Sequence, residues 1–466
     1  MAVRGTVEAI YDQVRREASP VPPSASLPTP AVACVLWRPA PGGREIYLAR
    51  RSLARTFLGG FWGFPGGAVE PSDPTATSAC AREVAEELGV TLPDEAAAYR
   101  LIGRFATPAV SPVRYDCLYF LVEAPPGCEP DPSASPELER GEWITPVAAL
   151  DRIRRGVWLA PTPIEMTLAE LAKGEDDGIE VRLAEASRRD RAARLWFFAD
   201  GIGIAPLETL TLPPATHTNA YVFGVRQLCV VDPGSHDPDE QEALARELEQ
   251  RIATGARVLA VLLTHHHADH TSGAAALAAR IGAPIWSHAE TARRVPFEIA
   301  RELDDGEVID LGERRLRCVF TPGHAPGHLC FLEEETGWMA AGDMVASVGT
   351  ILVDPSEGDM RVYLESLARM AELAPRVLLP AHGAPIADPA GKLAEYIRHR
   401  LWREEQVAVA LAGRGRATAR ELVPIAYADT APVLYPIAER SLISHLVKLA
   451  GDGRIRAVGE HWESVS

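Results

Sequence analysis

The alternation of hydrophobic and polar residues divides the chain into three segments of different character. In the first, apolar runs of strand length at 31–39 and 44–51 flank a Pro-Gly-Gly turn, and a stretch with helical spacing follows at 75–90. In the second, short apolar runs alternate with amphipathic stretches many times, which favours a layered α/β sandwich. In the third, helical stretches precede a short hairpin, an order typical of a winged helix.

These patterns predict an α/β protein with four parts. They are an N-terminal helix and Pro/Ser-rich linker (1–27), an α/β domain (28–180), a second α/β domain (195–393) and a small winged-helix domain (394–466). The basic stretch at 182–194 is interpreted as a solvated connector, with charges at Arg188, Arg189, Arg191 and Arg194.

Composition narrows the classes of protein that fit. Of 466 residues, 47% are hydrophobic and 24% are charged, as in a globular protein, and no apolar run reaches the ~18 residues of a membrane span. Seven scattered cysteines without a CxxC pair, and an N-terminus without an export signal, favour the cytoplasm. The net charge of −17 disfavours nonspecific nucleic-acid binding by the whole molecule. Nothing in the sequence defines an oligomeric state.

A polar motif, THHHADH at 264–270, directly follows an apolar run, and a helix is expected to begin near Ser272. A turn at a strand end projects its side chains past the sheet, where several imidazoles can converge. Zinc binds neutral imidazole nitrogens and carboxylate oxygens at ~2.0–2.2 Å. We therefore expect His265 and His267 to serve one ion, and Asp269 and His270 to serve a second.

Three more ligand-type residues stand at predicted strand exits, namely His324, Asp343 and His382. In order, HHHADH, TPGHAPGH, GD and AHG resemble the motifs of the metallo-β-lactamase superfamily over roughly 200–390. This resemblance implies an αββα sandwich with two zinc ions. By position, the first ion takes His265, His267 and His324, the second takes Asp269, His270 and His382, and Asp343 bridges them. His266 is left outside the ligand set, and His328 receives a supporting or structural role.

The same resemblance implies hydrolysis. A water held by zinc has its pKa lowered from ~15.7 to about 7, so hydroxide is available at neutral pH. It would attack a thioester, ester or phosphoester, and Asp269 is the expected catalytic residue that orients it. The substrate class is a small thioester or ester, as in glyoxalase II, with a coenzyme A adduct as one form.

A second acidic motif, REVAEELGV, spans 82–90. On a helix Glu83, Glu86 and Glu87 share one face, and clustered carboxylates favour a hard cation such as Mg²⁺. With the upstream FPGG turn, this motif resembles the Nudix hydrolases over about 28–180, which implies an α/β/α sandwich. The resemblance implies Mg²⁺ or Mn²⁺ at the three glutamates, Glu86 as a catalytic residue, and substrate contacts at Gly66, Gly67 and Arg82.

The Nudix resemblance has two departures. Asp73 stands where the family's box has its first glutamate, and one extra residue separates it from Arg82. The segments LARRS (48–52) and GFWGFPGG (60–67) partly resemble the coenzyme A diphosphatase motif, with its arginine offset to Arg55. Glu137 or Glu139 is a candidate for a further metal ligand. The resemblance implies diphosphate hydrolysis of a nucleotide-containing substrate.

The C-terminal segment resembles the winged-helix appendage of lactamase-β-like endoribonucleases. Its arginines are interpreted either as phosphate contacts or as parts of a packing module: Arg398, Arg400, Arg403, Arg414, Arg416 and Arg420. Three functions remain open on sequence alone. They are a zinc hydrolase of small thioesters joined to a Nudix domain, a zinc endoribonuclease acting on single-stranded RNA, and a nucleotide-binding sensor without turnover.

Overall fold

The structure is a computed structural model that describes residues 14, 27–55, 57–111 and 113–465. Nearly all of the predicted N-terminal helix and linker lies outside these residues. The described chain contains two compact units, which meet in sequence at residues 204 and 205. Among the described residues, the helices all lack the combination of length and apolar character that a membrane span requires.

The first unit is built on a mixed six-stranded sheet. Its order is β3-β2-β1-β5-β4, with β6 paired to β2, and only β1 and β5 run parallel. The strands are β1 (Thr29–Ala40), β2 (Gly43–Arg51), β3 (Trp62–Gly63), β4 (Arg100–Ala106), β5 (Tyr115–Glu123) and β6 (Leu138–Ile144). The hairpin predicted around the Pro-Gly-Gly turn is confirmed by the pairing of β1 with β2.

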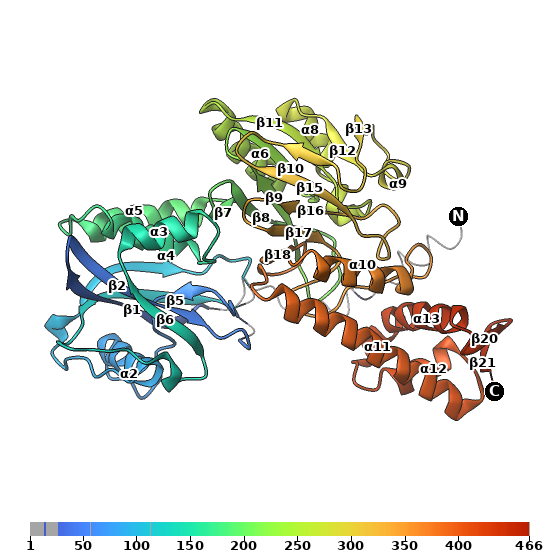
Figure 1. Ribbon diagram of the computed structural model, residues 1–466, viewed down its shortest axis with the longest axis horizontal. Helices are drawn as coiled ribbons and strands as arrows, with labels where there is room; N and C mark the ends of the chain where they lie inside the picture. Colours follow the sequence, from blue (N-terminus) through green and yellow to red (C-terminus); the bar gives the residue numbers. More distant parts are fainter. Residues whose placement is uncertain (1–13, 15–26, 56, 112, 466) are drawn as a thin grey trace. The chain divides into compact units, whose positions relative to one another are not determined.

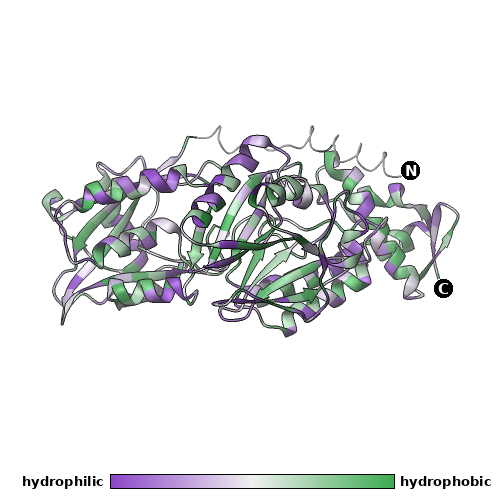
Figure 2. Ribbon diagram, turned by 90° about the horizontal axis from the view of Figure 1, so that it is seen from above, coloured by the Kyte–Doolittle hydropathy of each residue, from purple (hydrophilic) through white to green (hydrophobic). Residues whose placement is uncertain are grey.

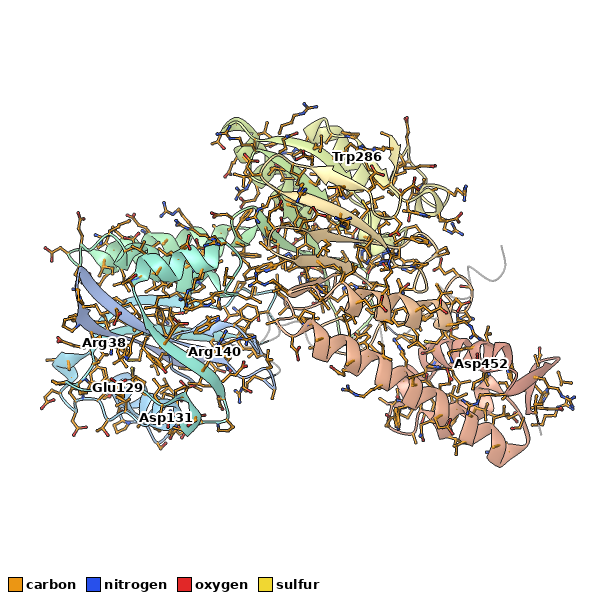
Figure 3. The ribbon with its side chains drawn as sticks, viewed as in Figure 1. Arg38, Glu129, Asp131, Arg140, Trp286 and Asp452 are labelled. Atoms are coloured by element: carbon orange, nitrogen blue, oxygen red, sulfur yellow. The ribbon has the colours of Figure 1, made fainter. Side chains whose placement is uncertain are left out.

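Helices cover both faces of this sheet (Figure 1). They are α2 (Ala76–Leu88) on one face, and α3 (Pro146–Arg154), α4 (Thr162–Leu171) and α5 (Ile179–Ala192) on the other. Along β1, Cys34 and Leu36 join the core under α2, while Val35 joins the core under the other helices. Arg140 on β6, labelled in Figure 3, lies 5.2 Å from the ring centre of Trp62. The sheet is thus the middle layer of an α/β/α sandwich.

Two local predictions have different outcomes in this unit. The helix expected over 75–90 is α2, capped by the Thr75 side chain and by Gly89 in the left-handed conformation at φ 66°. In the stretch at 182–194, Arg188, Arg189, Arg191 and Arg194 are exposed, as expected for a solvated face, but most of the stretch forms α5 rather than a connector. That helix buries Ile179 and Leu183 against the sheet and leaves its arginines on the outer face.

Two further sheets follow, and apart from their residues before 205 they lie in the second unit. One has the order β13-β12-β11-β10-β9-β8-β7 and the other the order β14-β15-β16-β17-β18. The strands of the first are β7 (Trp196–Ala199), β8 (Ile202–Glu208), β9 (His217–Phe223), β10 (Gln227–Val231), β11 (Arg257–Leu262), β12 (Ile285–Ser287) and β13 (Arg301–Glu302). Those of the second are β14 (Val308–Asp310), β15 (Arg315–Phe320), β16 (Leu329–Glu333), β17 (Trp338–Gly342) and β18 (Val377–Pro380).

Helices lie outside both sheets, which gives the αββα order expected from the sequence (Figure 1). The helices on the first sheet include α6 (Pro238–Ala253) and α8 (Ala274–Ile281), whose Ala274 and Ala278 pack on Val261 of β11. The second sheet packs on α10 (Met360–Glu372) and on the start of α11 (Pro389–Arg414), through Leu367 and Leu393. In Figure 2 the strands are mainly coloured as hydrophobic, whereas the helices alternate between the two colours, as amphipathic helices do.

The C-terminal part is a winged helix. It consists of the second half of α11, β19 (Arg416–Thr418), α12 (Ala419–Ala426), α13 (Tyr435–Gly451) and the hairpin of β20 (Ile455–Val458) with β21 (His461–Ser464). Two of the arginines interpreted as phosphate contacts are buried here. Arg400 and Arg403 are only 3% and 5% exposed, and they donate to the backbone carbonyls of Ile351 and Ala426. Packing, rather than phosphate binding, is the role of these two side chains.

Candidate metal centre

The seven residues expected to bind zinc come from strand ends of both sheets. His265 and His267 follow β11, and Asp269 and His270 lie on α7 (Ala268–Thr271), so the helix begins before the Ser272 expected from the sequence. His324 follows β15, while Asp343 and His382 follow β17 and β18. The structure brings all seven side chains to one edge of the sandwich in overlapping groups.

The first group is formed by His265, His267 and His324. Nδ1 of His267 lies 2.9 Å from Nε2 of His265 and 3.1 Å from Nε2 of His324, and the two Nε2 atoms are 3.3 Å apart. Ligand atoms at tetrahedral angles around a zinc ion are separated by about 3.3 Å, as follows from Zn–N bonds of ~2.0–2.1 Å. The three nitrogens therefore fit one zinc ion.

The second group is formed by Asp269, His270 and His382. Oδ2 of Asp269 lies 3.9 Å from Nε2 of His270 and 3.6 Å from Nε2 of His382. Asp343 stands between the groups, because its carboxylate lies 3.5 Å from His270, 3.3 Å from His382 and 3.6 Å from His324 of the first group. This arrangement suits a carboxylate that bridges two cations.

The chemistry of these donors also fits metal ions. Nε2 of His270 and Oδ1 of Asp343 are buried and have no hydrogen-bond partner among the residues that the structure describes, which is costly unless a cation satisfies them. Burial and the neighbouring imidazoles lower the pKa of His265 and bring that of His324 to about 4, so both rings stay neutral and keep a lone pair. At His270 burial also acts to lower the pKa, but the surrounding carboxylates outweigh it and raise the pKa.

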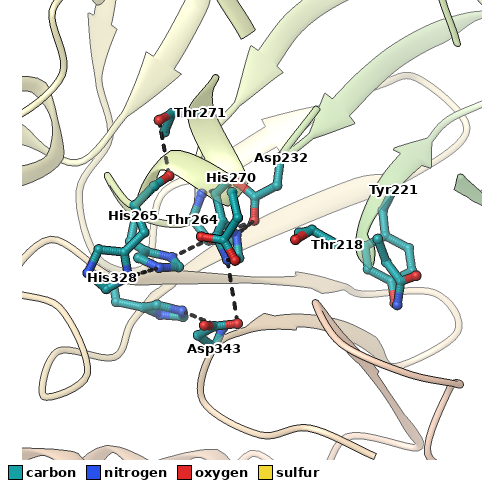
Figure 4. Close-up of polar contacts among 12 residues, drawn as sticks. Thr218, Tyr221, Asp232, Thr264, His265, His270, Thr271, His328 and Asp343 are labelled. Atoms are coloured by element: carbon teal, nitrogen blue, oxygen red, sulfur yellow. Dashed lines mark hydrogen bonds and ion pairs between the residues drawn. The ribbon is translucent and has the colours of Figure 1, made fainter. Parts of the chain in front are cut away.

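Further residues orient the rings of the second group. Asp232 accepts from Nδ1 of His270 at 2.9 Å, and its carboxylate also accepts from the backbone N and hydroxyl of Thr264 (Figure 4). Nδ1 of His382 donates to the carbonyl of His217 at 3.0 Å. In both rings the proton on Nδ1 leaves Nε2 available to a metal ion.

His328 lies close to the ligands without joining a candidate metal group among the described residues. Its Nε2 accepts from the backbone N of Asp343 at 3.1 Å, and its Nδ1 lies 2.9 Å from the hydroxyl of Thr321. The ring therefore holds the backbone that carries Asp343.

Sequence analysis missed Glu357, which lies on the loop before α10. Its two carboxylate oxygens lie 2.6 Å from Nε2 of His267 and 2.8 Å from Nε2 of His266. The neighbouring carbonyl of Leu352 accepts from Nδ1 of His324 at 2.8 Å. The acidic run DPSEGD at 354–359 was only a weak signal for a contact with these histidines. It lies far from them in the sequence, so the pattern does not show that the two segments meet.

The Nudix glutamates are arranged around a short glycine turn in the first unit. The backbone N of Gly66 donates to Glu87 at 2.9 Å, and a Cβ on Gly67 would lie only 2.6–2.7 Å from the carboxylate of Glu83. Glu86 is 60% exposed at its side chain and pairs with Arg82. Within the described residues, the three glutamates do not come close enough to form one group of ligand atoms.

The other residues predicted to belong to the Nudix site form ion pairs near this turn. Arg82 binds Asp73 through two nitrogens at 3.0 Å and also contacts Glu83. Glu137 pairs with Arg55 at 2.8 Å, and Glu139 pairs with Arg50 at 3.1 Å. Burial raises the pKa of Glu87 to about 7 and also raises that of Glu83, as expected for acids that a cation would help to ionise.

Comparisons with known proteins agree with the three parts of the chain. Residues 27–161 match the NUDIX domain, residues 213–382 the metallo-beta-lactamase superfamily, and residues 418–462 the beta-lactamase associated winged helix domain. The lactamase-like protein aptB of Emericella nidulans is 34% identical over 251 residues, which cover 51% of this chain and 77% of that protein. An atrochrysone carboxyl ACP thioesterase of Aspergillus chevalieri is 32% identical over 250 residues, with the same two shares.

Among solved structures, a beta-lactamase domain protein from Burkholderia ambifaria has a TM-score of 0.52 at 24% identity. The match covers 58% of this chain and 93% of that one, and it shows a shared fold. This protein belongs to the metallo-β-lactamase superfamily. It is a hydrolase of that fold that also carries a Nudix domain and a β-lactamase-associated winged helix.

Proposed function

We propose that this protein is a dinuclear zinc thioesterase, which cleaves the thioester of a small acyl group carried on a coenzyme A-type or carrier-protein thiol. The observation that carries the proposal is the convergence of two groups of ligand atoms on the shared Asp343. The first group is His265, His267 and His324, and the second is Asp269, His270 and His382. A similar protein that is named as an acyl-carrier-protein thioesterase supports the choice of a thioester.

The chain's own residues would orient water and move its proton. When bound, two zinc ions would supply Lewis-acid polarisation of the carbonyl and a water of lowered pKa. Asp269, half-buried at the edge of the centre, would hold the attacking water and accept its proton. The water oxygen bonds to the acyl carbon, the carbon–sulfur bond breaks, and the thiolate takes the proton from Asp269. No side chain has to act as a nucleophile.

The test is a metal analysis followed by a substrate screen with the full chain. The purified protein is expected to contain about two zinc ions per chain and to hydrolyse acyl-CoA or S-acylglutathione. Asp269→Ala should lose this activity by several powers of ten while its unfolding temperature stays near that of the wild type. Unchanged hydrolysis in Asp269→Ala would refute the proposal.

We infer a second activity in the Nudix domain, namely Mg²⁺- or Mn²⁺-dependent hydrolysis of a diphosphate in a nucleotide-containing ligand. The contacts of Gly66 with Glu87 and of Arg82 with Asp73 support it, because they hold the acidic helix against the glycine turn. Glu86→Gln should abolish diphosphate hydrolysis and leave thioester hydrolysis intact, and Asp269→Ala should do the reverse. Loss of both activities in either variant would contradict two separate sites.

RNA and a sensor role receive less support. One similar protein is named as a lactamase-like protein and another as a thioesterase, and two arginines of the winged helix are buried. Single-stranded RNA therefore serves as the negative control of the screen. Metal retention without turnover of any substrate would instead favour a sensor.

A reducing cytoplasm remains the proposed location, since all seven cysteines, each within the described ranges, are free.

A further inference from the structure

The loop at 347–359 supplies partners to two ligands of the first metal group. Leu352 accepts from Nδ1 of His324, and Glu357 faces Nε2 of His267. A ring that donates from one nitrogen presents the lone pair of the other, so these contacts select Nε2 of His324 and Nδ1 of His267. Those are the two atoms that point into the first group. The second group takes its partners from outside this loop, at Asp232 and the carbonyl of His217.

The 347–359 loop has no helix or strand of its own. A turn around Asp354 shapes the part that carries Glu357. The carboxylate of Asp354 accepts from the backbone N and the hydroxyl of Ser356 at 2.8 and 2.6 Å, and its carbonyl accepts from the backbone N of Gly358 at 2.7 Å. The position of Glu357 therefore depends on where Asp354 is held.

Side chains from α11 and α13 hold the loop at four points. Arg440 binds the Asp354 carboxylate through two nitrogens, and Ser444 donates to the carbonyl of Val353 at 2.6 Å. From α11, Arg400 donates to Ile351, and Tyr396 donates to the carbonyl of Gly349 at 3.0 Å. Ser444, Arg400 and Tyr396 are at most 3% exposed, so the contacts are internal to the protein. A mobile surface appendage would not make such contacts.

We propose that α11 and α13 position the first metal site by holding the 347–359 loop, with Glu357 and Arg440 as positioning residues. The winged helix is then part of the metal centre's support. The proposal rests on the proposed function, because it assumes that His265, His267 and His324 bind a metal ion. It predicts that disturbing the loop lowers metal affinity at the first group only, because the second group takes its hydrogen-bond partners from elsewhere.

The test measures metal binding in chain variants of full length. Cobalt(II) is titrated into the metal-free protein in competition with a chelator, and its visible spectrum reports ligand geometry. His382→Ala serves as a background in which only the first group is complete, and His324→Ala as one in which only the second is complete. Glu357→Gln should lower the cobalt affinity of the first site by ~10–100-fold, which is the usual loss when a hydrogen-bond partner of a ligating histidine is removed. The affinity of the second site should stay unchanged.

Arg440→Met should weaken the first site toward the lower end of that ~10–100-fold range, and Arg440→Lys should recover part of the loss. Hydrogen exchange over 347–359 should quicken in metal-free Arg440→Met. The matched control is Arg361→Met. Arg361 of α10 also forms an ion pair between a winged-helix aspartate and its guanidinium, here with Asp452 (labelled in Figure 3) rather than with Asp354. Ser444→Ala, a smaller change, carries the test if Arg440→Met fails to fold.

The outcomes separate the two proposals. A wild-type chain that binds no cobalt at these residues would refute the proposed metal centre. A wild-type chain that binds cobalt, with equal affinity, spectrum and exchange in the Arg440 and Ser444 variants, would refute only the positioning role. Equal losses at both sites, or in the Arg361 control, would also overturn it, because they would indicate general destabilisation.

Discussion

Replacing Asp232 by asparagine tests whether Asp232 keeps Nε2 of His270 free to bind a metal ion in the second group. Asp232 is 2% exposed, and its two oxygens accept from the backbone N of Thr264, from the Thr264 hydroxyl and from Nδ1 of His270. Asparagine keeps the shape but exchanges one oxygen for a donor. If its oxygen stays on the backbone N of Thr264, its NH₂ group faces Nδ1 of His270. The ring must then carry its proton on Nε2, the atom that faces Asp269 and Asp343.

The size of the effect follows from the lost hydrogen bond. A hydrogen bond to a charged group contributes about 1.5–3 kcal/mol, which corresponds to a loss of about 10- to 150-fold in an equilibrium constant. We expect Asp232→Asn to weaken metal binding at the second group by this factor and to spare the first. Chelator-competed cobalt titration measures both sites, and thermal unfolding of the metal-free chain gives the structural cost. A variant with lower stability but unchanged affinity at the second group would show that Asp232 only supports the fold, and the reasoning would be refuted.

Three further perturbations give clear expectations. Gly67→Ala should reduce diphosphate hydrolysis at least ~10-fold, because its Cβ would displace the carboxylate of Glu83. Gly63→Ala meets only an ordinary contact at 3.9 Å and should leave the activity unchanged. Arg403→Met should lower the free energy of unfolding by about 1–3 kcal/mol in denaturant titrations without changing affinity for single-stranded RNA; a drop in RNA affinity would restore the phosphate-binding interpretation. Burial lowers the pKa of His445 to about 4. Its folded pKa is below the unfolded value of ~6.5, so stability present above pH 6.5 should be lost as the pH falls toward 4, by on the order of 3 kcal/mol. His445→Leu should remove this acid sensitivity, and an unchanged pH profile would contradict the assignment.

What the sequence could predict was local. The HHHADH motif and the strand ends that carry His324, Asp343 and His382 sit next to recognisable apolar runs, so their meeting at one edge followed from the sandwich. The helix α2 was predictable from spacing and its glycine cap.

What it could not predict depended on contacts between distant residues. Glu357 lies 90 residues from His267, and Asp232 lies 38 residues from His270, with no pattern that ties them together. The sequence left the arginines of α11 open between phosphate contacts and packing for a related reason. Charge in a sequence does not reveal burial, and Arg400 and Arg403 find carbonyl partners only once α11 packs against its neighbours.

The length of α11 has a practical consequence for dissecting this protein. It is one 26-residue helix whose early turns pack on the second sheet and whose later turns form the core of the winged helix. A shortened chain that stops where the metallo-β-lactamase match ends, at residue 382, would keep every expected zinc ligand yet lose Tyr396 and Arg400. Such a truncated enzyme should therefore be judged by its metal affinity as well as by its solubility, since an inactive fragment would say little about the catalytic power of the intact hydrolase.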